Sequence, residues 1–561
     1  MILQHIVDLV ELLATKGVKN AIVSPGSRNA PLTIALARHP NIDSKSISDE
    51  RSAGFIALGM AQTLNQPVVL CCTSGSAVYN YAPAVAEAFF QEIPLIILSA
   101  DRPKEWIHQH DGQTIYQQDI FGKHVKKSFS LGADFQHNDA SWEVNRLVNE
   151  AVNTANTFPK GPVHINVPLR EPFYPEKNEN IVFKKVRNIE ILSSEKTLSL
   201  HDVSALHEMI LKGKKVLLAI GQHHLDSEFI SQIKEFSNKY QIPIVGDIIS
   251  NLGNDFIHNH DFFASKLTPE FVPDILITYG KSFISKSFKT FLRNNYIATH
   301  IHFQENELHI DTFQSVTHLI YANFKAFIDS NSQIMNDLER NKLERIEYKL
   351  NLEKLDLQWN DKKRIFWNEA LAFNELSVFE VFLNKIPSNS VLHLANSMTV
   401  RYANHIGLST VGQIEVFANR GTSGIDGCVS SAVGCALATD KLVFLIVGDV
   451  AFFYDRNALW NNYLPNNLRI ILLNNHGGGI FRMLEGSSAQ PELEEFFETN
   501  QTMNAKNTSE DAGLNYNLVK SISDFNNVLP SFINSNSPAS IIEIESSAIV
   551  NTEIFKLFKK M

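Results

Sequence analysis

The chain has 561 residues, which is too many for one hydrophobic core, so we expect about three domains. Hydrophobic residues make up 44% of it and charged residues 20%, which is ordinary for a globular protein and argues against intrinsic disorder. The formal net charge of -10 argues against general binding to nucleic acid or to an anionic membrane surface.

The first predicted element is a helix within MILQHIVDLVELLATKG (1–17). Asp8 and Glu11 stand in its apolar pattern and the stretch has no basic start, so it predicts an amphipathic helix rather than a signal peptide. No uninterrupted apolar run approaches the about 18–20 residues that a membrane span requires. The four cysteines show no C-x-x-C spacing, which predicts buried free thiols in a cytoplasmic protein and suggests neither zinc nor disulfides.

The first 178 residues alternate short apolar runs with helical stretches. Strands that read as continuous apolar blocks, each followed by a helix, are typical of a parallel sheet that helices cover on both faces. We therefore assign residues 1–178 to an N-terminal domain. Its expected strands are NAIVS (20–24), PVVLCCTS (67–74), PLIILSA (94–100) and VHINV (163–167).

A polar passage rich in lysine and glutamate (174–199) looks like a linker to a second block of the same kind, and we assign residues 179–355 to a central α/β domain. The segment from about 333 to 363 is dominated by charged residues, and we expect a solvated helical connector there. The strands expected before it are KKVLLAIG (214–221), QIPIVGD (241–247), PDILITYG (273–280) and ATHIHF (298–303).

Residues 356–561 repeat the alternation, so the whole chain predicts an α/β fold with parallel sheets flanked by helices in each of three domains. In the first and last blocks, turns rich in glycine and serine follow the strands. Crevices at the carboxyl ends of parallel strands are where such folds bind ligands. The strands expected in the last block are SVLHLA (390–395), IEVFAN (414–419), LVFLIVGD (442–449), LRIILLNN (468–475) and ASIIEIE (539–545).

Two of these strands end in residues suited to a metal ion. One ends in Gly448 and Asp449, and the next ends in Asn475, 26 residues after Asp449. In a parallel sheet this spacing brings a carboxylate and a carboxamide oxygen to the same edge. Mg²⁺ prefers hard oxygen ligands and commonly shares them with phosphate oxygens. We therefore expect Asp449, Asn475 and the backbone carbonyl of Gly477 to hold a cation and a diphosphate.

This pair resembles the metal–diphosphate motif of thiamine-diphosphate enzymes, in which Gly-Asp is followed one helix later by asparagine. Val450 stands where many of those families have a second glycine. The resemblance also implies a glutamate of the first domain that faces N1′ of the cofactor's aminopyrimidine. Glu50 fits this role, because it heads the apolar run in ISDERSAGFIALGM (47–60), although charges there also suit an ordinary helix N-terminus.

A narrower resemblance rests on SPGSRNAPL (24–32), DER (49–51), TSGSAVYNYAPAVAEA (73–88), ADRP (100–103), NRGTSGIDG (419–427) and NNHGGGIF (474–481). As a set, in this order, they resemble the 2-succinyl-5-enolpyruvyl-6-hydroxy-3-cyclohexene-1-carboxylate synthases of menaquinone biosynthesis. The resemblance implies an N-terminal pyrimidine-binding domain and a C-terminal diphosphate- and metal-binding domain. It also implies a transferase that uses thiamine diphosphate with Mg²⁺ or Mn²⁺.

The reaction implied is decarboxylation of 2-oxoglutarate and 1,4-addition of the resulting carbanion to isochorismate. Both substrates carry several carboxylates, which planar guanidinium groups suit. Since the glutamate and the diphosphate half come from different subunits in this superfamily, the resemblance further implies a homodimer or homotetramer with active sites at the subunit interface. No nucleic-acid partner and no membrane span are expected.

The matching motifs imply the site residues. Ile425 corresponds to the bulky residue that bends the cofactor, and Ile480 and Phe481 to the apolar wall beside its thiazolium ring. A plain surface lysine is as good an interpretation of Lys286 as a substrate ligand. The implied residues are Glu50, Gln113, Arg28 and Arg102 for catalysis; Glu50, Ser423, Gly424, Ile425, Gly448, Asp449, Asn475, Gly477, Ile480 and Phe481 for the cofactor; Ser27, Arg28, Arg102, Gln113, Lys286, Ser397, Arg401 and Arg420 for the substrates; and Asp449, Asn475 and Gly477 for the metal.

Three other interpretations stay open at this point. One is an acetohydroxyacid synthase or a 2-oxoacid decarboxylase, although arginine-bearing turns favour a multiply anionic substrate over pyruvate. Another is a non-catalytic small-molecule binding protein, against which the joint presence of Glu50, Asp449 and Asn475 argues. An NAD-dependent dehydrogenase would need a glycine fingerprint that is missing. His476 stands where the resembled family commonly has asparagine, and we assign it no role.

Overall fold

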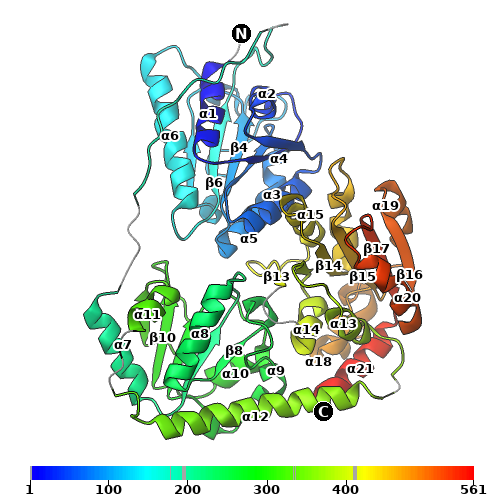
Figure 1. Cartoon of the computed structure of the whole chain (residues 1–561). Helices are drawn as coiled ribbons and strands as arrows, with labels where there is room; N and C mark the ends of the chain where they lie inside the picture. Colours follow the sequence, from blue (N-terminus) through cyan, green and yellow to red (C-terminus); the bar gives the residue numbers. More distant parts are fainter. Residues whose placement is uncertain are drawn as a thin grey trace.

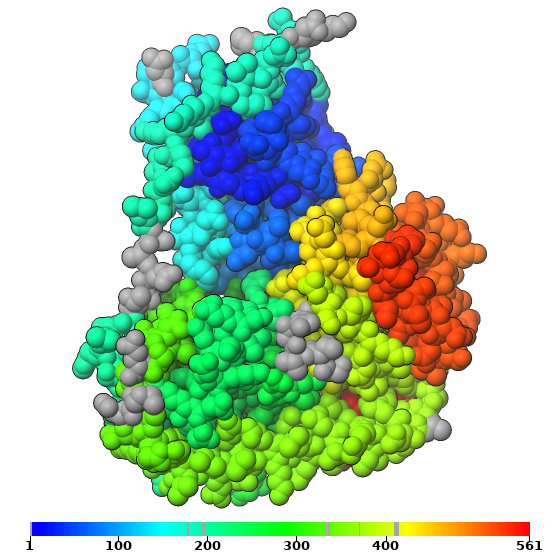
Figure 2. Space-filling model, viewed as in Figure 1, coloured from blue at the N-terminus to red at the C-terminus, as the bar shows by residue number. Residues whose placement is uncertain are grey.

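The computed structural model describes residues 3–176, 179–192, 198–332, 334, 337–369, 371–408 and 414–561. These residues form three parallel sheets flanked by helices, which confirms the predicted α/β fold with three domains (Figure 1). The N-terminal, central and C-terminal domains lie against one another, with the central domain in green below the blue N-terminal one (Figure 2). The proposed domain boundaries stay a prediction. Within the described part of the chain, no helix is long and apolar enough to cross a membrane.

The N-terminal sheet has six strands in the order β2-β1-β3-β4-β6-β5. Helices α1, α2 and α6 cover one face, and α3 and α5 cover the other. Its strands are β1 (Asn20–Val23), β2 (Asp43–Ser46), β3 (Val68–Cys72), β4 (Leu95–Asp101), β5 (Lys127–Ser130) and β6 (Val163–Pro168). Its helices are α1 (Gln4–Thr15), α2 (Ala30–Arg38), α3 (Glu50–Leu64), α4 (Ser76–Asn80), α5 (Ala82–Gln91) and α6 (Asn138–Asn156).

The central sheet has five strands in the order β11-β10-β9-β7-β8. Helices α7, α8 and α11 pack on one face, and the other face joins a core shared with the C-terminal domain. Its strands are β7 (Val216–Ile220), β8 (Ile244–Gly246), β9 (Ile275–Tyr279), β10 (Thr299–Gln304) and β11 (His318–Tyr321). Its helices are α7 (Leu200–Lys212), α8 (Ser227–Tyr240), α9 (His260–Phe263), α10 (Lys286–Arg293) and α11 (Phe324–Asn331).

The C-terminal sheet has six strands in the order β13-β12-β14-β15-β17-β16. One of its faces shares a core with the N-terminal domain and the other with the central domain. Its strands are β12 (Val391–Leu394), β13 (Glu415–Phe417), β14 (Val443–Gly448), β15 (Leu468–Asn474), β16 (Asn515–Val519) and β17 (Ser540–Glu545). Its helices are α13 (Glu375–Leu383), α14 (Met398–Ile406), α15 (Cys428–Ala438), α16 (Asp449–Asp455), α17 (Ile480–Met483), α18 (Glu485–Ser488), α19 (Lys506–Asp511), α20 (Ile522–Phe532) and α21 (Ala548–Lys560).

Helix α12 (Lys342–Phe366) corrects part of the expectation for the charged connector. The segment is helical, but one side of it is packed against the central and C-terminal domains and is not solvated (Figure 1). Arg345 donates to the carbonyl of Tyr240 at the end of α8 (2.6 Å), and Lys363 donates to His405 and Ile406 at the end of α14 (3.2 and 3.1 Å). Cations are favourable at helix C-termini, so part of the charge run joins the two domains. The buried residues recur every three or four positions: Arg345, Tyr348, Leu352, Asp356, Trp359, Lys363 and Phe366.

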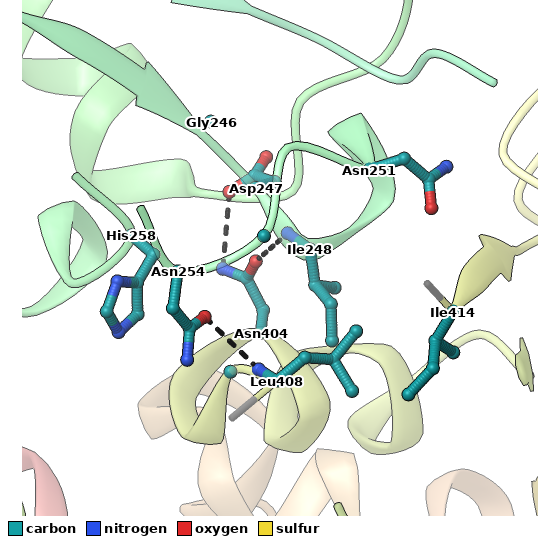
Figure 3. A pocket seen from close by; sticks show the side chains of 11 residues that line it. Gly246, Asp247, Ile248, Asn251, Asn254, His258, Asn404, Leu408 and Ile414 are labelled. Carbon is teal, nitrogen blue, oxygen red and sulfur yellow. Dashed lines mark hydrogen bonds between the residues drawn. The ribbon is translucent and has the colours of Figure 1, made fainter. Parts of the chain in front are cut away.

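The central and C-terminal domains also meet around Asn404 of α14 (Figure 3). Its carboxamide donates to Asp247 (3.2 Å) and accepts the N–H of Ile248 (2.8 Å). The N–H of Leu408 donates to Asn254 across the same junction (3.2 Å). The cavity between these residues measures about 20 Å³, which is room for a single water molecule. This junction is therefore a packed contact and is too small for a cofactor.

A buried histidine of β12 predicts an acid-sensitive fold. Burial lowers the pKa of His393 to about 3, and its ring lies 5.3 Å from that of Phe417. The folded chain keeps His393 neutral, while the unfolded chain protonates it below its ordinary pKa of about 6.5, so stability is lost as pH falls from about 6.5 towards 3. We compare the free energy of unfolding of His393→Leu with that of the wild type, measured by urea unfolding. This difference should shift in favour of the variant by about 2 kcal/mol when the pH is lowered from 7.5 to 5.0.

The exposed His201 of α7 offers the matched control. His201→Leu makes the same substitution at an exposed position and reports its cost outside the core at both pH values. A His393→Leu variant whose stability relative to the wild type is the same at pH 7.5 and 5.0 would contradict the prediction.

Candidate active site

The carboxyl ends of β14 and β15 bring the predicted metal ligands to one sheet edge. Gly448 pairs with Leu473 in the register of these neighbouring strands, so Asp449 and Asn475 leave the sheet side by side. The edge also lies beside the β12/β14 boundary, where the connections leave in opposite directions along the sheet. Such switch points open a crevice at the strand ends.

Asp449 is buried at the start of α16, at this edge of the sheet. One carboxylate oxygen accepts the N–H of Val450 (2.9 Å), and the other accepts the side-chain amide of Gln501 (2.7 Å). Burial raises the pKa of Asp449 to about 6, although both hydrogen bonds favour its charged form. A carboxylate held in so dry a setting is stabilised by a nearby cation.

Asn475 supplies the open acceptor of the site. Its side-chain N–H donates to Glu375 (2.7 Å), while its Oδ1 is buried and has no hydrogen-bond partner. A buried carbonyl oxygen without a partner is costly, and a bound cation would satisfy it. A Cβ on Gly479 would lie 3.1 Å from the Asn475 side chain, so glycine allows the backbone to approach closely there. The donor set of Asp449, Asn475 and the Gly477 carbonyl fits a hard cation such as Mg²⁺.

Free space adjoins the proposed ligands. A Cβ on Gly448 would meet no atom within 4 Å, so the chain leaves room there for a bound group. Ile480 and Phe481 are half-buried at the start of α17, and the Phe481 ring lies 5.8 Å from that of Phe497. Ser27 lies far from them in sequence, exposed in the turn after β1.

The turn between β13 and α15 carries three of the predicted cofactor residues. Asn396 fixes it by donating to the carbonyls of Asn419 (2.7 Å) and Gly424 (2.6 Å) and by accepting from Arg420 (2.8 Å). Ile425 is 38% exposed on this turn, so its side chain is accessible to a bound group.

Several predicted residues sit in left-handed backbone conformations. Gln113 (φ 58°), Ser397 (φ 72°) and Ser423 (φ 61°) all do so, as does His476 (φ 65°), beside Asn475. Non-glycine residues adopt this region rarely, and where they do they cluster at functional sites. Non-glycine residues in all three domains share this conformation, so it does not by itself group the predicted residues. It gives His476 a backbone role in turning the chain after β15.

Glu50 begins α3 and is half-exposed in the single chain. The side-chain amide of Asn80 donates to it (3.3 Å). The preceding Asp49 caps the helix and accepts from Asn457 (2.8 Å), which follows α16. The mouth of α3 therefore lies against the end of the helix that Asp449 begins.

Two predicted arginines meet at the edge of the N-terminal sheet. Arg102 donates to Asp111 (2.5 Å), Ser74 (2.8 Å) and the carbonyl of Gln113 (2.9 Å), which orders the turns after β3 and β4. Burial, and then the neighbouring positive charge of Arg102, lower the pKa of Arg28. Asp111 pairs with Arg102 and, with Glu171 and Asp101, opposes the fall in the pKa of Arg28, so acidic groups already lie beside both arginines. Guanidinium groups of this kind suit carboxylates.

A second cationic group lies where the C-terminal and central domains face each other. Burial, and then Arg401, lower the pKa of Arg420, and Arg401 donates to the carbonyl of Ser397 (2.5 Å). The predicted Lys286 is exposed at the start of α10. Lys289, one turn later, is half-buried and donates to the carbonyl of Phe283 (2.9 Å). Burial lowers its pKa, Asp247 opposes this, and the positive charges of Arg293, Arg420 and Arg401 lower the pKa further. The structure therefore adds Lys289 to this group.

Sequence reasoning also missed Glu87 of α5, although it lies within one of the quoted motifs. This fully buried carboxylate accepts the N–H groups of Gly421 (2.8 Å) and Thr422 (2.6 Å) in the turn that bears Arg420. Gln91, one turn later, donates to Glu87 (2.5 Å) and accepts from Gln222 of the central domain (3.1 Å). The N-terminal domain thus fixes the arginine turn of the C-terminal domain. The only signal in the sequence was a lone acid in an apolar helix.

Comparison with known proteins places this geometry among thiamine-dependent enzymes. The family described as "Thiamine pyrophosphate enzyme, N-terminal TPP binding domain" matches residues 7–120. The chain is 45% identical to a 2-succinyl-5-enolpyruvyl-6-hydroxy-3-cyclohexene-1-carboxylate synthase of Cytophaga hutchinsonii, over 100% of this chain and 99% of that protein. Synthases of the same name from Flavobacterium johnsoniae and Porphyromonas gingivalis are 39% and 35% identical, over 99% and 98% of this chain and 98% and 96% of theirs.

Proposed function

The chain belongs to the family of 2-succinyl-5-enolpyruvyl-6-hydroxy-3-cyclohexene-1-carboxylate synthases, and we propose that it joins 2-oxoglutarate to isochorismate with loss of CO₂, as a step of menaquinone biosynthesis. One observation supports the proposal independently of family membership. The Oδ1 of Asn475, beside the buried Asp449, is buried and has no hydrogen-bond partner. An enzyme of this class requires such a place for a cation and a diphosphate.

We assign the cation, Mg²⁺ or Mn²⁺, to Asp449, the Asn475 Oδ1 and the Gly477 carbonyl. Gly448 leaves space for the diphosphate, and Ser423, Gly424 and Ile425 border the rest of the cofactor with Ile480 and Phe481. When bound, thiamine diphosphate supplies the carbon nucleophile and the electron sink for decarboxylation. Glu50 would hydrogen bond to its aminopyrimidine ring and hold the proton that the ring exchanges.

The arginines recognise the carboxylates of the two substrates. Arg28 and Arg102 form one anion site with Ser27 and Gln113, and Arg401 and Arg420 form another with Ser397 and a lysine of α10. Two cationic groups suit two substrates that each carry two carboxylates, because bidentate guanidinium contacts fix both charge and orientation.

We also propose a homodimer or homotetramer in which Glu50 of one subunit completes the site of another. Large aromatic side chains stay exposed close to the mouth of α3: Tyr79 (56%), Tyr454 (52%) and Trp460 (65%). Exposed aromatic residues in one area favour a protein interface. The four buried free thiols support a cytoplasmic location.

The proposed function is tested by mixing purified protein with thiamine diphosphate, Mg²⁺, 2-oxoglutarate and isochorismate, and following the loss of isochorismate by absorbance. Consumption should require all four components and should fail when pyruvate replaces 2-oxoglutarate. Turnover of pyruvate instead would move the protein to the acetohydroxyacid synthases or decarboxylases. Inactivity of folded protein with every 2-oxoacid would favour a binding protein.

The raised pKa of Asp449 predicts the pH dependence of cation binding. Below about pH 6 the metal-free protein protonates this carboxyl, and a cation must then displace the proton. The apparent affinity for Mn²⁺, with thiamine diphosphate present, should fall about fivefold between pH 6 and 5 and change little between pH 7 and 8. Titration followed by Mn²⁺ electron paramagnetic resonance measures this, and an affinity that does not change between pH 7 and 5 contradicts it.

A further inference from the structure

Glu375 is a buried carboxylate that no sequence motif contains, and it lies directly behind the proposed cation site. It is the first residue of α13 and is 2% exposed. Its Oε1 accepts the side-chain N–H of Asn475 (2.7 Å) and the hydroxyl of Ser546 (3.3 Å). Asn551 fixes the position by accepting the Glu375 N–H (3.0 Å) and by donating to Ser546 (3.0 Å).

We infer that Glu375 is the positioning residue that orients the Asn475 carboxamide, so that Oδ1 faces the cation. This inference rests on the proposed function. Oε1 of Glu375 accepts from both Asn475 and Ser546, so this oxygen takes the amide N–H and directs Oδ1 of Asn475 to the opposite side. The reversed amide would set its oxygen against a carboxylate oxygen and leave its N–H groups towards the cation. Glu375 therefore selects the one orientation in which Asn475 can be a ligand.

The neighbouring Asn474 is held by a similar hydrogen bond to a buried carboxylate, but its oxygen has partners within the protein. Its side-chain N–H donates to another buried carboxylate, Glu543 (2.6 Å). Its Oδ1, however, accepts from the N–H of His476 (3.2 Å) and from Gln501 (3.0 Å). The protein thus satisfies the Asn474 oxygen internally, whereas the Asn475 oxygen is oriented in the same way and left open. Of these two asparagines, Asn475 is therefore the one whose oxygen is available to a bound group.

The comparison also supplies a matched control. Glu543 is as buried as Glu375, belongs to the same domain and accepts from the adjacent asparagine, whose oxygen is already satisfied. Glu543→Gln therefore reports the cost of altering a buried carboxylate in this region. Glu375→Met removes the acceptor at similar volume, and Glu375→Gln keeps one oxygen that can accept from Asn475.

The test measures Mn²⁺ binding without substrates, by electron paramagnetic resonance of free Mn²⁺ in the presence of thiamine diphosphate. Loss of a partner behind a metal ligand typically weakens affinity about 10–100-fold. We expect that loss for Glu375→Met, a clearly smaller loss for Glu375→Gln, and an affinity close to wild type for Glu543→Gln. If Glu375→Met does not fold, Glu375→Gln carries the test, and it must bind Mn²⁺ more weakly than Glu543→Gln.

Two results would overturn the inference alone: a wild-type affinity in Glu375→Met, or equal losses in Glu375→Gln and Glu543→Gln. A wild-type protein without cofactor-dependent Mn²⁺ binding, or an Asp449→Ala variant that binds as tightly as wild type, would instead overturn the proposed cation site and with it this inference. The two failures are therefore distinguishable.

Discussion

Glu50→Gln is expected to lower kcat by about 10²–10⁴-fold, which is the usual contribution of a positioned acid or base. Glutamine nearly matches glutamate in shape and can keep the contact with Asn80, but it cannot hold the proton that the aminopyrimidine ring exchanges. Steady-state loss of isochorismate at saturating substrates measures the effect. Thermal unfolding and Mn²⁺ binding should remain close to wild type, because neither depends on that proton.

Asp49→Asn is the matched control one residue earlier. Asp49 caps α3 and accepts from Asn457, and asparagine is an equally good helix cap. This variant makes the same acid-to-amide change at the mouth of the same helix, and it should retain most of the wild-type turnover. A Glu50→Gln variant as active as Asp49→Asn would remove Glu50 from the chemistry.

The sequence predicted the interior of each sheet but missed four strands. The missed strands β2, β5, β11 and β16 all lie at sheet edges. Their sequences, DSKS, KSFS, HLIY and NYNLV, are short and mostly half-exposed, whereas the interior strand β14 is a fully apolar run up to Gly448. An edge strand faces solvent along one side, so it needs no continuous apolar block and leaves little pattern to detect.

The candidate site likewise contains residues that the sequence could predict and residues that it could not. Asp449 and Asn475 could be predicted because each follows an apolar strand, and parallel strands end at one sheet edge. Glu375 lies 100 residues before Asn475, and Glu87 lies 334 residues before Gly421. Nothing local in the sequence pairs residues so far apart, because their contacts exist only after the domains have packed. The charged residues of α12 led to a wrong prediction of a solvated helix, because Lys363 is buried against carbonyls at the end of α14.

Glycines join the N-terminal and C-terminal domains at the crossing of α3 and α15. A Cβ on Gly434 of α15 would lie 2.0 Å from the carbonyl oxygen of Ile56, and a Cβ on Gly59 of α3 would lie 2.0 Å from that of Ser431. The two helix backbones therefore touch directly, within the apolar core that the two domains share. This crossing therefore fixes the N-terminal domain against the C-terminal domain of the same chain.

Gly434→Ala is therefore expected to destabilise the protein by about 3 kcal/mol, at the upper end of the usual cost of overpacking. In an uncrowded helix the same change would stabilise the protein by about 1 kcal/mol. The sign of the change in the free energy of unfolding therefore tests whether the two helices approach this closely. Gly486→Ala in α18 is the control, since a Cβ there meets no atom within 4 Å, and it should be neutral or slightly stabilising. Urea unfolding measures both variants. Because neither Ile56 nor Gly434 can move aside without moving its whole helix, relief comes only by separating α3 from α15. A Gly434→Ala variant as stable as Gly486→Ala would show that the helices do not cross in contact.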